Sequence, residues 1–136
     1  MDDPENALVE RLAAVGSLVE IGVGERPTIA RRLADRGVDV TVTDVDPKPV
    51  PESVRFVVDD VTEPTLAVYE AADVIFARNL PPELHHPARA VAREVDAAFW
   101  FTTLGGDQPA VPVEREQLPG GETLYRATDR DSKALE

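Results

Sequence analysis

The feature that most constrains this chain is a glycine turn placed directly after an apolar stretch. Residues 17–21 have the pattern of a buried strand, and Gly22-Val23-Gly24 follows them shortly before Pro27, a favourable first residue for a helix. Glycines at such a turn let the backbone approach a ligand, and the start of the next helix offers unpaired N–H groups and a positive dipole end. The pattern therefore predicts a strand–turn–helix unit that holds a ligand, with a turn that binds nothing as the alternative.

The residues around the turn discriminate between two classes of ligand. Nicotinamide cofactors favour the pattern G-x-G-x-x-G, and Pro27 occupies the position of its third glycine. An acid, Glu20, stands two residues before Gly22, which resembles the first motif, E/D-x-G-x-G, of methyltransferases that use S-adenosylmethionine (SAM). The further glycine that those enzymes commonly carry is replaced here by Arg26. The turn therefore favours SAM as the cofactor, held by Glu20, Gly22 and Gly24.

Acidic residues follow the next two expected strands. Asp44 closes the strand at 38–43, where a carboxylate can accept hydrogen bonds from both ribose hydroxyls; the alternative is an aspartate that only opens a turn. Asp59 and Asp60 close the strand at 54–58, where methyltransferases often place an acid near the adenine amino group. Of these two we favour Asp60 as a cofactor-binding residue, although either could cap a turn.

Strand and helix patterns alternate along the chain, which favours βαβ units and a parallel sheet. The sequence predicts an α/β fold of methyltransferase-like, Rossmann-like type: a three-layer sandwich with a mostly parallel sheet in the order 3-2-1-4-5, and Trp100 on a central or near-central strand. One domain is expected over residues 1–128, with a flexible tail at 129–136. Strands are expected at 17–21, 38–43, 54–58, 73–77, 97–104 and, as a last short element, 123–127; helices are expected at 4–15, 27–36, 64–72 and from 87 onward.

The segment after the fourth strand is the place for acceptor chemistry, because ligands in this fold sit outside the carboxyl ends of the strands. Asn79 and the two prolines that follow Leu80 partly match the N/D/S-P-P-Y/F motif of amino-methylating enzymes, so Asn79 is a weak catalytic candidate beside the alternative of a rigid connecting loop. His85 and His86 lack a carboxylate at metal-binding spacing. We expect both to be exposed polar residues, and no metal site.

Composition narrows the class of protein. The chain has 26 acidic against 14 basic side chains, a net charge of −12, and all but two of its cations are arginines. This balance resembles cytoplasmic proteins of salt-loving archaea, whose carboxylates keep the chain dissolved in concentrated salt; the alternative is an ordinary acidic protein. The absence of cysteine excludes disulfides and agrees with a cytoplasmic location. No apolar run is long enough for a membrane span, and no basic patch indicates a nucleic-acid partner.

Three segments together resemble one family of small archaeal proteins of uncharacterised function. They are Val19 to Pro27, the turn Thr43-Asp44-Val45, and Arg78 to Leu84. Members of that family pair V-E-V-G-x-G-x-R-P with a later R-P-P-P-E-L and are similar to a trimmed methyltransferase domain; the resemblance runs from about Glu10 to Leu104. It implies a methyltransferase fold and SAM as a ligand, and it accounts for Arg26-Pro27 as a family feature. It implies no role for Asn79, because Asn79-Leu80 stands where the family has further proline.

The leading hypothesis is a SAM-binding protein and candidate methyltransferase with an unknown acceptor. One alternative is a non-catalytic binding or regulatory module, which the short stretch after the fifth strand favours. Another is a nicotinamide-dependent oxidoreductase, which Pro27 disfavours.

Overall fold

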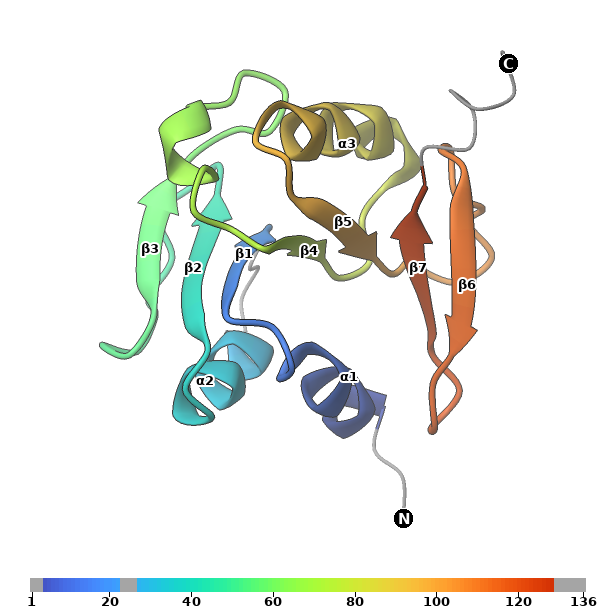
Figure 1. Cartoon of the computed structure of the whole chain (residues 1–136), viewed down its shortest axis with the longest axis horizontal. Helices are drawn as coiled ribbons and strands as arrows, with labels where there is room; N and C mark the ends of the chain where they lie inside the picture. Colours follow the sequence, from blue (N-terminus) through green and yellow to red (C-terminus); the bar gives the residue numbers. More distant parts are fainter. Residues whose placement is uncertain (1–3, 23–26, 129–136) are drawn as a thin grey trace.

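The computed structural model describes residues 4–22 and 27–128, which form a seven-stranded sheet with helices on both faces (Figure 1). In chain order the elements are α1 (Pro4–Leu12), β1 (Ser17–Ile21), α2 (Thr28–Asp35), β2 (Asp39–Asp44), β3 (Arg55–Val58), the 3₁₀ turn η1 (Leu66–Val68), β4 (Val74–Ala77), the 3₁₀ turn η2 (Pro82–Leu84), α3 (His85–Glu94), β5 (Ala98–Phe101), β6 (Val113–Gln117) and β7 (Thr123–Ala127).

The sheet has the order β3-β2-β1-β4-β5-β7-β6. β1 to β5 are parallel, which confirms the predicted order 3-2-1-4-5 and the Rossmann-like class. β7 runs antiparallel to β5, and β6 runs antiparallel to β7 at the edge of the sheet. Trp100 lies on β5, which has neighbours on both sides, as the sequence predicts.

The helices α1 and α2 cover one face of the sheet (Figure 1). The apolar stripe of α2, which includes Ile29 and Leu33, packs with Leu8 and Leu12 of α1 against strand residues such as Leu18. Side chains alternate between the faces of a strand, so Glu20 points toward this same layer. A carboxyl group is thereby placed at the edge of an otherwise apolar core.

The opposite face is covered by α3 (Figure 1). Tyr69, which follows η1, belongs to the same buried cluster as the apolar residues of α3. Val19 and Ile21 of β1 face this layer, and Phe99 and Phe101 of β5 pack under α3. Both cores include residues near the carboxyl ends of the parallel strands, such as Val42 in one and Ala77 in the other, so the loops at that edge follow buried strand ends.

Three expectations about elements differ from the structure. The helix expected at 64–72 is only the 3₁₀ turn η1, and the Asp59 carboxylate accepts the backbone N–H of Thr65 directly before it. The last long helix begins at His85 instead of Pro87. The expected strand at 123–127 is present as β7, whereas its partner β6 was not predicted because its polar residues carry no apolar pattern.

Candidate functional site

The predicted site residues gather at the carboxyl edge of the parallel strands. Glu20 and Gly22 lie at the end of β1, Asp44 ends β2, Asp60 follows β3 and Asn79 follows β4. Gly24 lies outside the described residues. Since β1 has β2 on one side and β4 on the other, the topology brings these positions onto one edge.

Gly22 has a backbone conformation that other residues rarely adopt. Its φ is +72°, in the left-handed region that favours glycine, and a Cβ built there would meet no atom within 4 Å. Its N–H donates a hydrogen bond of 2.9 Å to the carbonyl of Thr43. The turn is therefore fixed to β2 on one side and open to solvent on the other.

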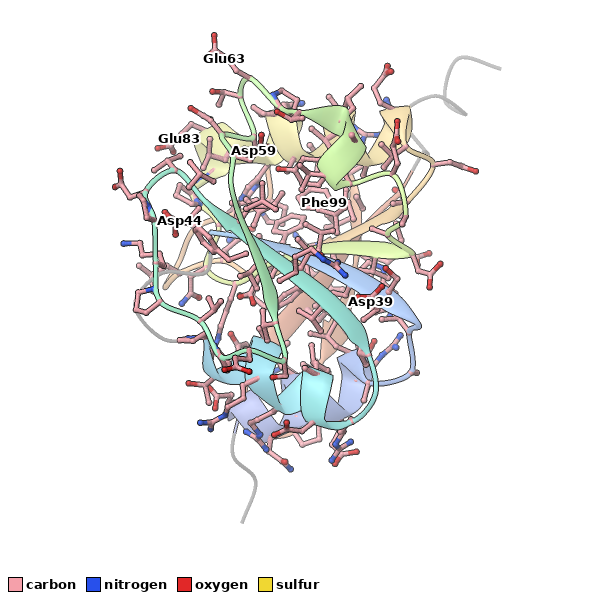
Figure 2. The ribbon with its side chains drawn as sticks, turned by 90° about the vertical axis from the view of Figure 1, so that its left-hand side faces the viewer. Asp39, Asp44, Asp59, Glu63, Glu83 and Phe99 are labelled. Atoms are coloured by element: carbon pink, nitrogen blue, oxygen red, sulfur yellow. The ribbon has the colours of Figure 1, made fainter. Side chains whose placement is uncertain are left out.

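Asp44 stands next to this turn in the sheet. The register pairs Ile21 with Thr43, so Gly22 and Asp44 continue the same two strands. The Asp44 carbonyl accepts the N–H of Asp59 at 3.0 Å, and its carboxylate accepts the N–H of Asp46 at 3.4 Å. Figure 2 shows Asp44 and Asp39 at opposite ends of β2. The half-exposed Asp44 carboxylate is thus held at the edge that carries the glycine turn.

The two acids after β3 have different surroundings. The Asp59 carboxylate is buried and accepts hydrogen bonds from the Tyr69 hydroxyl at 2.6 Å and from the Thr65 N–H at 3.0 Å. Burial, together with this hydrogen bond, raises the pKa of the Tyr69 hydroxyl. Asp60 is exposed, and hydrogen bonds from the side chain and backbone of Thr62 lower the pKa of its carboxyl. Asp59 therefore stabilises the loop, and Asp60 is the acid of the pair that solvent can reach.

Glu20 is a buried acid, with only 5% of its surface exposed. Burial raises the pKa of its carboxyl to about 8; the nearby Arg78 acts in the opposite direction, and Glu5 adds to the rise. At neutral pH most of this carboxyl is therefore protonated, and it can both donate and accept a hydrogen bond. Glu20 does not form part of the exposed surface in the way that Asp60 does.

Arg78 is a charged residue of this region that no single motif predicts as part of a site. Its guanidinium lies 3.4 Å from carboxylate oxygens of Glu5 in α1 and of Glu122 in the β6–β7 turn. Glu5 also pairs with Arg32 of α2 at 3.3 Å. The cluster joins elements from both ends of the sequence beside Glu20. The one sequence feature that could have indicated a role for Arg78 was its place in the family pattern.

The segment after β4 is fixed by Thr102, which follows β5. The Thr102 hydroxyl accepts the N–H of Asn79 at 2.8 Å, and the Thr102 carbonyl accepts the N–H of Leu80 at 2.9 Å. Asn79 has φ +56°, a conformation in which asparagine is enriched among non-glycine residues. The exposed Asn79 thus has a conformational reason to be asparagine, in addition to the catalytic role that its motif suggests.

His85 corrects an expectation, because it is fully buried and not exposed. Its Nδ1 accepts the N–H of Ala110 at 3.0 Å, so Nε2 carries the proton and donates to the carbonyl of Leu80 at 2.9 Å. The ring also packs against Phe101, 4.5 Å between centroids. His85 therefore joins the loop after β4 to the loop after β5, whereas His86 is exposed as expected. Within residues 4–22 and 27–128 no group of three or more histidine, cysteine or acidic side chains could hold a metal ion.

Comparison with solved structures supports the fold assignment. An RNA methyltransferase from Salinibacter ruber, solved in complex with S-adenosyl-L-homocysteine, aligns with a TM-score of 0.64 and 20% identity over 94% of this chain and 92% of that one. A TehB-like SAM-dependent methyltransferase from Corynebacterium glutamicum aligns with a TM-score of 0.61 and 19% identity, covering 90% and 85% of the two chains. At these identities the likeness concerns the fold: this chain has the Rossmann-like fold of methyltransferases. None of the described helices has the length and apolar character needed to cross a membrane.

Comparison of sequences identifies the family. A protein of Halobacterium salinarum, named as a UPF0146 protein, is 49% identical over 118 residues, which are 87% of this chain and 92% of that protein. The family model described as "Uncharacterised protein family (UPF0146)" matches residues 1–130. The chain therefore belongs to the UPF0146 family, whose archaeal members include that Halobacterium protein.

Proposed function

We propose that this protein binds SAM at the carboxyl edge of its sheet and acts as a methyltransferase. The observation that carries the proposal is the open, left-handed turn at Gly22, whose N–H is fixed to β2 one residue before Asp44. A ligand that extends from the end of β1 to the end of β2 would contact the backbone of Gly22 first and the carboxylate of Asp44 next. This arrangement fits a nucleoside, whose ribose hydroxyls can donate hydrogen bonds to the carboxylate. Structural neighbours that bind S-adenosylhomocysteine support the choice of cofactor.

The residues at this edge fit the parts of SAM. Asp44 would accept hydrogen bonds from the ribose hydroxyls, as an acid does after the second strand of related folds. Val45, which is 59% exposed, offers an apolar surface for the adenine ring, and the exposed Asp60 can accept from its amino group. The amino-acid part would lie over Gly22, above the Glu20 carboxyl. Gly24 is a further proposed contact.

When bound, SAM supplies an electrophilic methyl group to an acceptor. The protein's own contribution would be to hold that acceptor in line and to exclude water. Asn79, after β4, and Leu104, which follows β5 and is 65% exposed, are placed to contact an acceptor because they follow adjacent parallel strands. Thr102 and His85 would position these loops without touching the reacting atoms.

One observation favours a second candidate function, a SAM-binding module without catalysis. Between β5 and β6 the chain has no helix; residues 102–112 form a loop in the described structure. Few structural elements therefore surround the place where a methyl acceptor would bind. A protein of this kind would use the bound nucleoside as a regulatory ligand.

Calorimetry with SAM, S-adenosylhomocysteine, adenosine and NAD⁺ tests the proposal and its alternatives. We expect the first two ligands to bind and Asp44→Asn to weaken their binding by about 1–3 kcal/mol, the loss expected for hydrogen bonds to a charged acceptor. Asp39→Asn is the matched control, because Asp39 lies on the same strand at its other end and its side chain is 61% exposed.

Failure of both SAM and S-adenosylhomocysteine to bind would refute the cofactor assignment, and tight binding of NAD⁺ alone would favour an oxidoreductase. SAM binding without methyl transfer to a panel of amine, hydroxyl and RNA acceptors would favour the non-catalytic module. An equal loss in the Asp39 and Asp44 variants would refute the role of Asp44.

A further inference from the structure

An apolar groove runs beside α3, on the face of the sheet that α3 covers. It has a volume of about 450 Å³ and lies between α3 and the loop after β3. This loop and α3 are side by side at the top of Figure 1. The lining is mostly apolar: the loop contributes Val61, Pro64 and Leu66, and α3 contributes Pro87, Ala90 and Val91. The groove therefore offers an apolar surface along one side of a helix.

The connection from β3 to β4 passes along this groove and contains only the three-residue 3₁₀ turn η1. Connections between parallel strands usually contain an α-helix, which packs on the sheet beside its neighbours. On the other face of the sheet α1 and α2 pack together in this way. Here Leu66, which lines the groove, is 36% exposed. One side of α3 is therefore open to a helix from outside the fold.

The exposed face of α3 is complementary to itself. It carries His86, Ala90, Arg93 and Glu94. His86 and Glu94 lie four residues before and after Ala90, about 6 Å along the helix axis in either direction. A two-fold axis through Ala90 would set a second α3 antiparallel to the first, with each His86 opposite Glu94 of the other copy and each Arg93 opposite Pro87. An imidazole N–H can donate to a carboxylate whether or not the ring is charged.

The groups needed for this pairing are available. Neither His86 nor Glu94 forms a hydrogen bond or ion pair with another described residue. Glu94 is the one charged side chain among the eight residues that line the groove, so an interface there would bury little charge. Ala90 is small, which lets two helix axes approach to about 8 Å. Two copies with a net charge of −12 repel each other, but in molar salt the screening length is about 3 Å, and pairs within an interface are screened much less.

We propose that this groove and the exposed face of α3 form an interface between two copies of the chain, related by a two-fold axis near Ala90. A basic helix of another protein would suit Glu94 and would leave His86 without an acceptor, whereas a second copy supplies a partner for each of them. Gly22 and Asp44 do not line the groove, so each copy keeps its own proposed SAM site and the interface does not depend on SAM binding.

The test is the mass of the full chain in solution, measured by sedimentation equilibrium in molar potassium chloride from micromolar to millimolar concentration. We expect the mass to rise with concentration from that of one chain to that of two chains, and no further, because a two-fold interface is closed. A wild type that stays monomeric throughout would overturn the proposal and leave the groove to a different protein. Growth beyond the dimer would overturn the two-fold arrangement.

An exchange of the two polar residues locates the interface. His86→Glu sets acid against acid at two symmetric places and should weaken association by roughly tenfold. Combining it with Glu94→His restores a complementary pair and should recover the association. Ser53→Glu, at an exposed position before β3, is the control for added charge. Association that His86→Glu leaves unchanged, that the double variant does not recover, or that Ser53→Glu weakens equally would overturn the assignment.

Two apolar variants test the packing. Ala90→Gln puts a larger side chain at the crossing point and should weaken association by roughly tenfold, because the helices can no longer approach closely. Leu66→Ala should weaken it by less, and Val58→Ala, at an apolar residue that is 52% exposed on the edge strand β3, should leave it unchanged. The changed residues are exposed, so the variants are expected to fold, which circular dichroism checks. Equal effects of Leu66→Ala and Val58→Ala, or none of Ala90→Gln, would overturn the placement of the interface on α3.

Discussion

Replacing Glu20 by glutamine should stabilise the protein at neutral and higher pH and change little in mild acid. Glu20 is 5% exposed, and burial raises the pKa of its carboxyl from 4.5 to about 8. Between these values the unfolded chain has lost a proton that the folded chain keeps, so the free energy of unfolding decreases as pH rises. The stability is fully present below pH 4.5, decreases through the window and levels off above about pH 8.

The size of the effect follows from the width of this window. One pKa unit corresponds to about 1.36 kcal/mol, so a rise from 4.5 to about 8 costs the folded state on the order of 4–5 kcal/mol above pH 8 and about 3 kcal/mol at pH 7. Glutamine has nearly the same shape and no titrating group, and therefore removes this dependence. Other shifted groups, such as Asp60, are present in both proteins and cancel in the comparison.

The assay is guanidinium-induced unfolding of the wild type and Glu20→Gln from about pH 5 to about pH 9 in the same salt. We expect the difference in unfolding free energy to grow in favour of the variant as pH rises. Glu83→Gln, at an exposed acid, is the control and should show no such trend. A difference that stays constant over this range, or one that favours the wild type increasingly at high pH, would refute the assignment of a raised pKa to Glu20.

Two further predictions concern stability. Tyr69→Phe removes the hydroxyl that donates to the buried Asp59 carboxylate and should cost about 1.5–3 kcal/mol in unfolding experiments, whereas Tyr125→Phe leaves that pair intact; equal small losses in both variants would contradict a structural role for Asp59. With a net charge of −12, the melting temperature should rise as potassium chloride increases toward molar concentration, because screening shortens the range of repulsion to about 3 Å; a melting temperature that does not change between dilute and molar salt would show that the acidic composition is not a salt adaptation.

The order of the parallel strands could be predicted because each strand is followed by a clear breaker and because right-handed crossovers leave few topologies. The same reasoning placed Gly22 and Asp44 on neighbouring strand ends, and the register of β1 with β2 confirms that arrangement. β6 has no such signal. Its residues Glu114 and Glu116 are polar, and the strand is recognised only by its antiparallel pairing with β7.

What the sequence did not indicate are contacts between distant residues. The burial of His85 depends on acceptor and donor groups at Leu80 and Ala110, and the second of these is 25 residues away along the chain. The sequence of two adjacent histidines does not indicate which of them faces the core. The local pattern favours exposure of both histidines, whereas the packing of α3 over β5 buries His85.

The same principle explains the surroundings of Glu20. The motif predicts an acid at this position, but its protonation depends on how deeply α1 and α2 bury it and on where Arg78 and its partners lie. Glu5 is 73 residues from Arg78, and Glu122 is 44 residues from it. A short motif fixes which residue stands at the end of β1, whereas tertiary structure fixes its charge. If SAM binds with its charged amino group beside Glu20, the mostly neutral carboxyl should release its proton. Proton release on SAM binding at neutral pH would therefore show that the acid of the motif contacts the amino group of the cofactor.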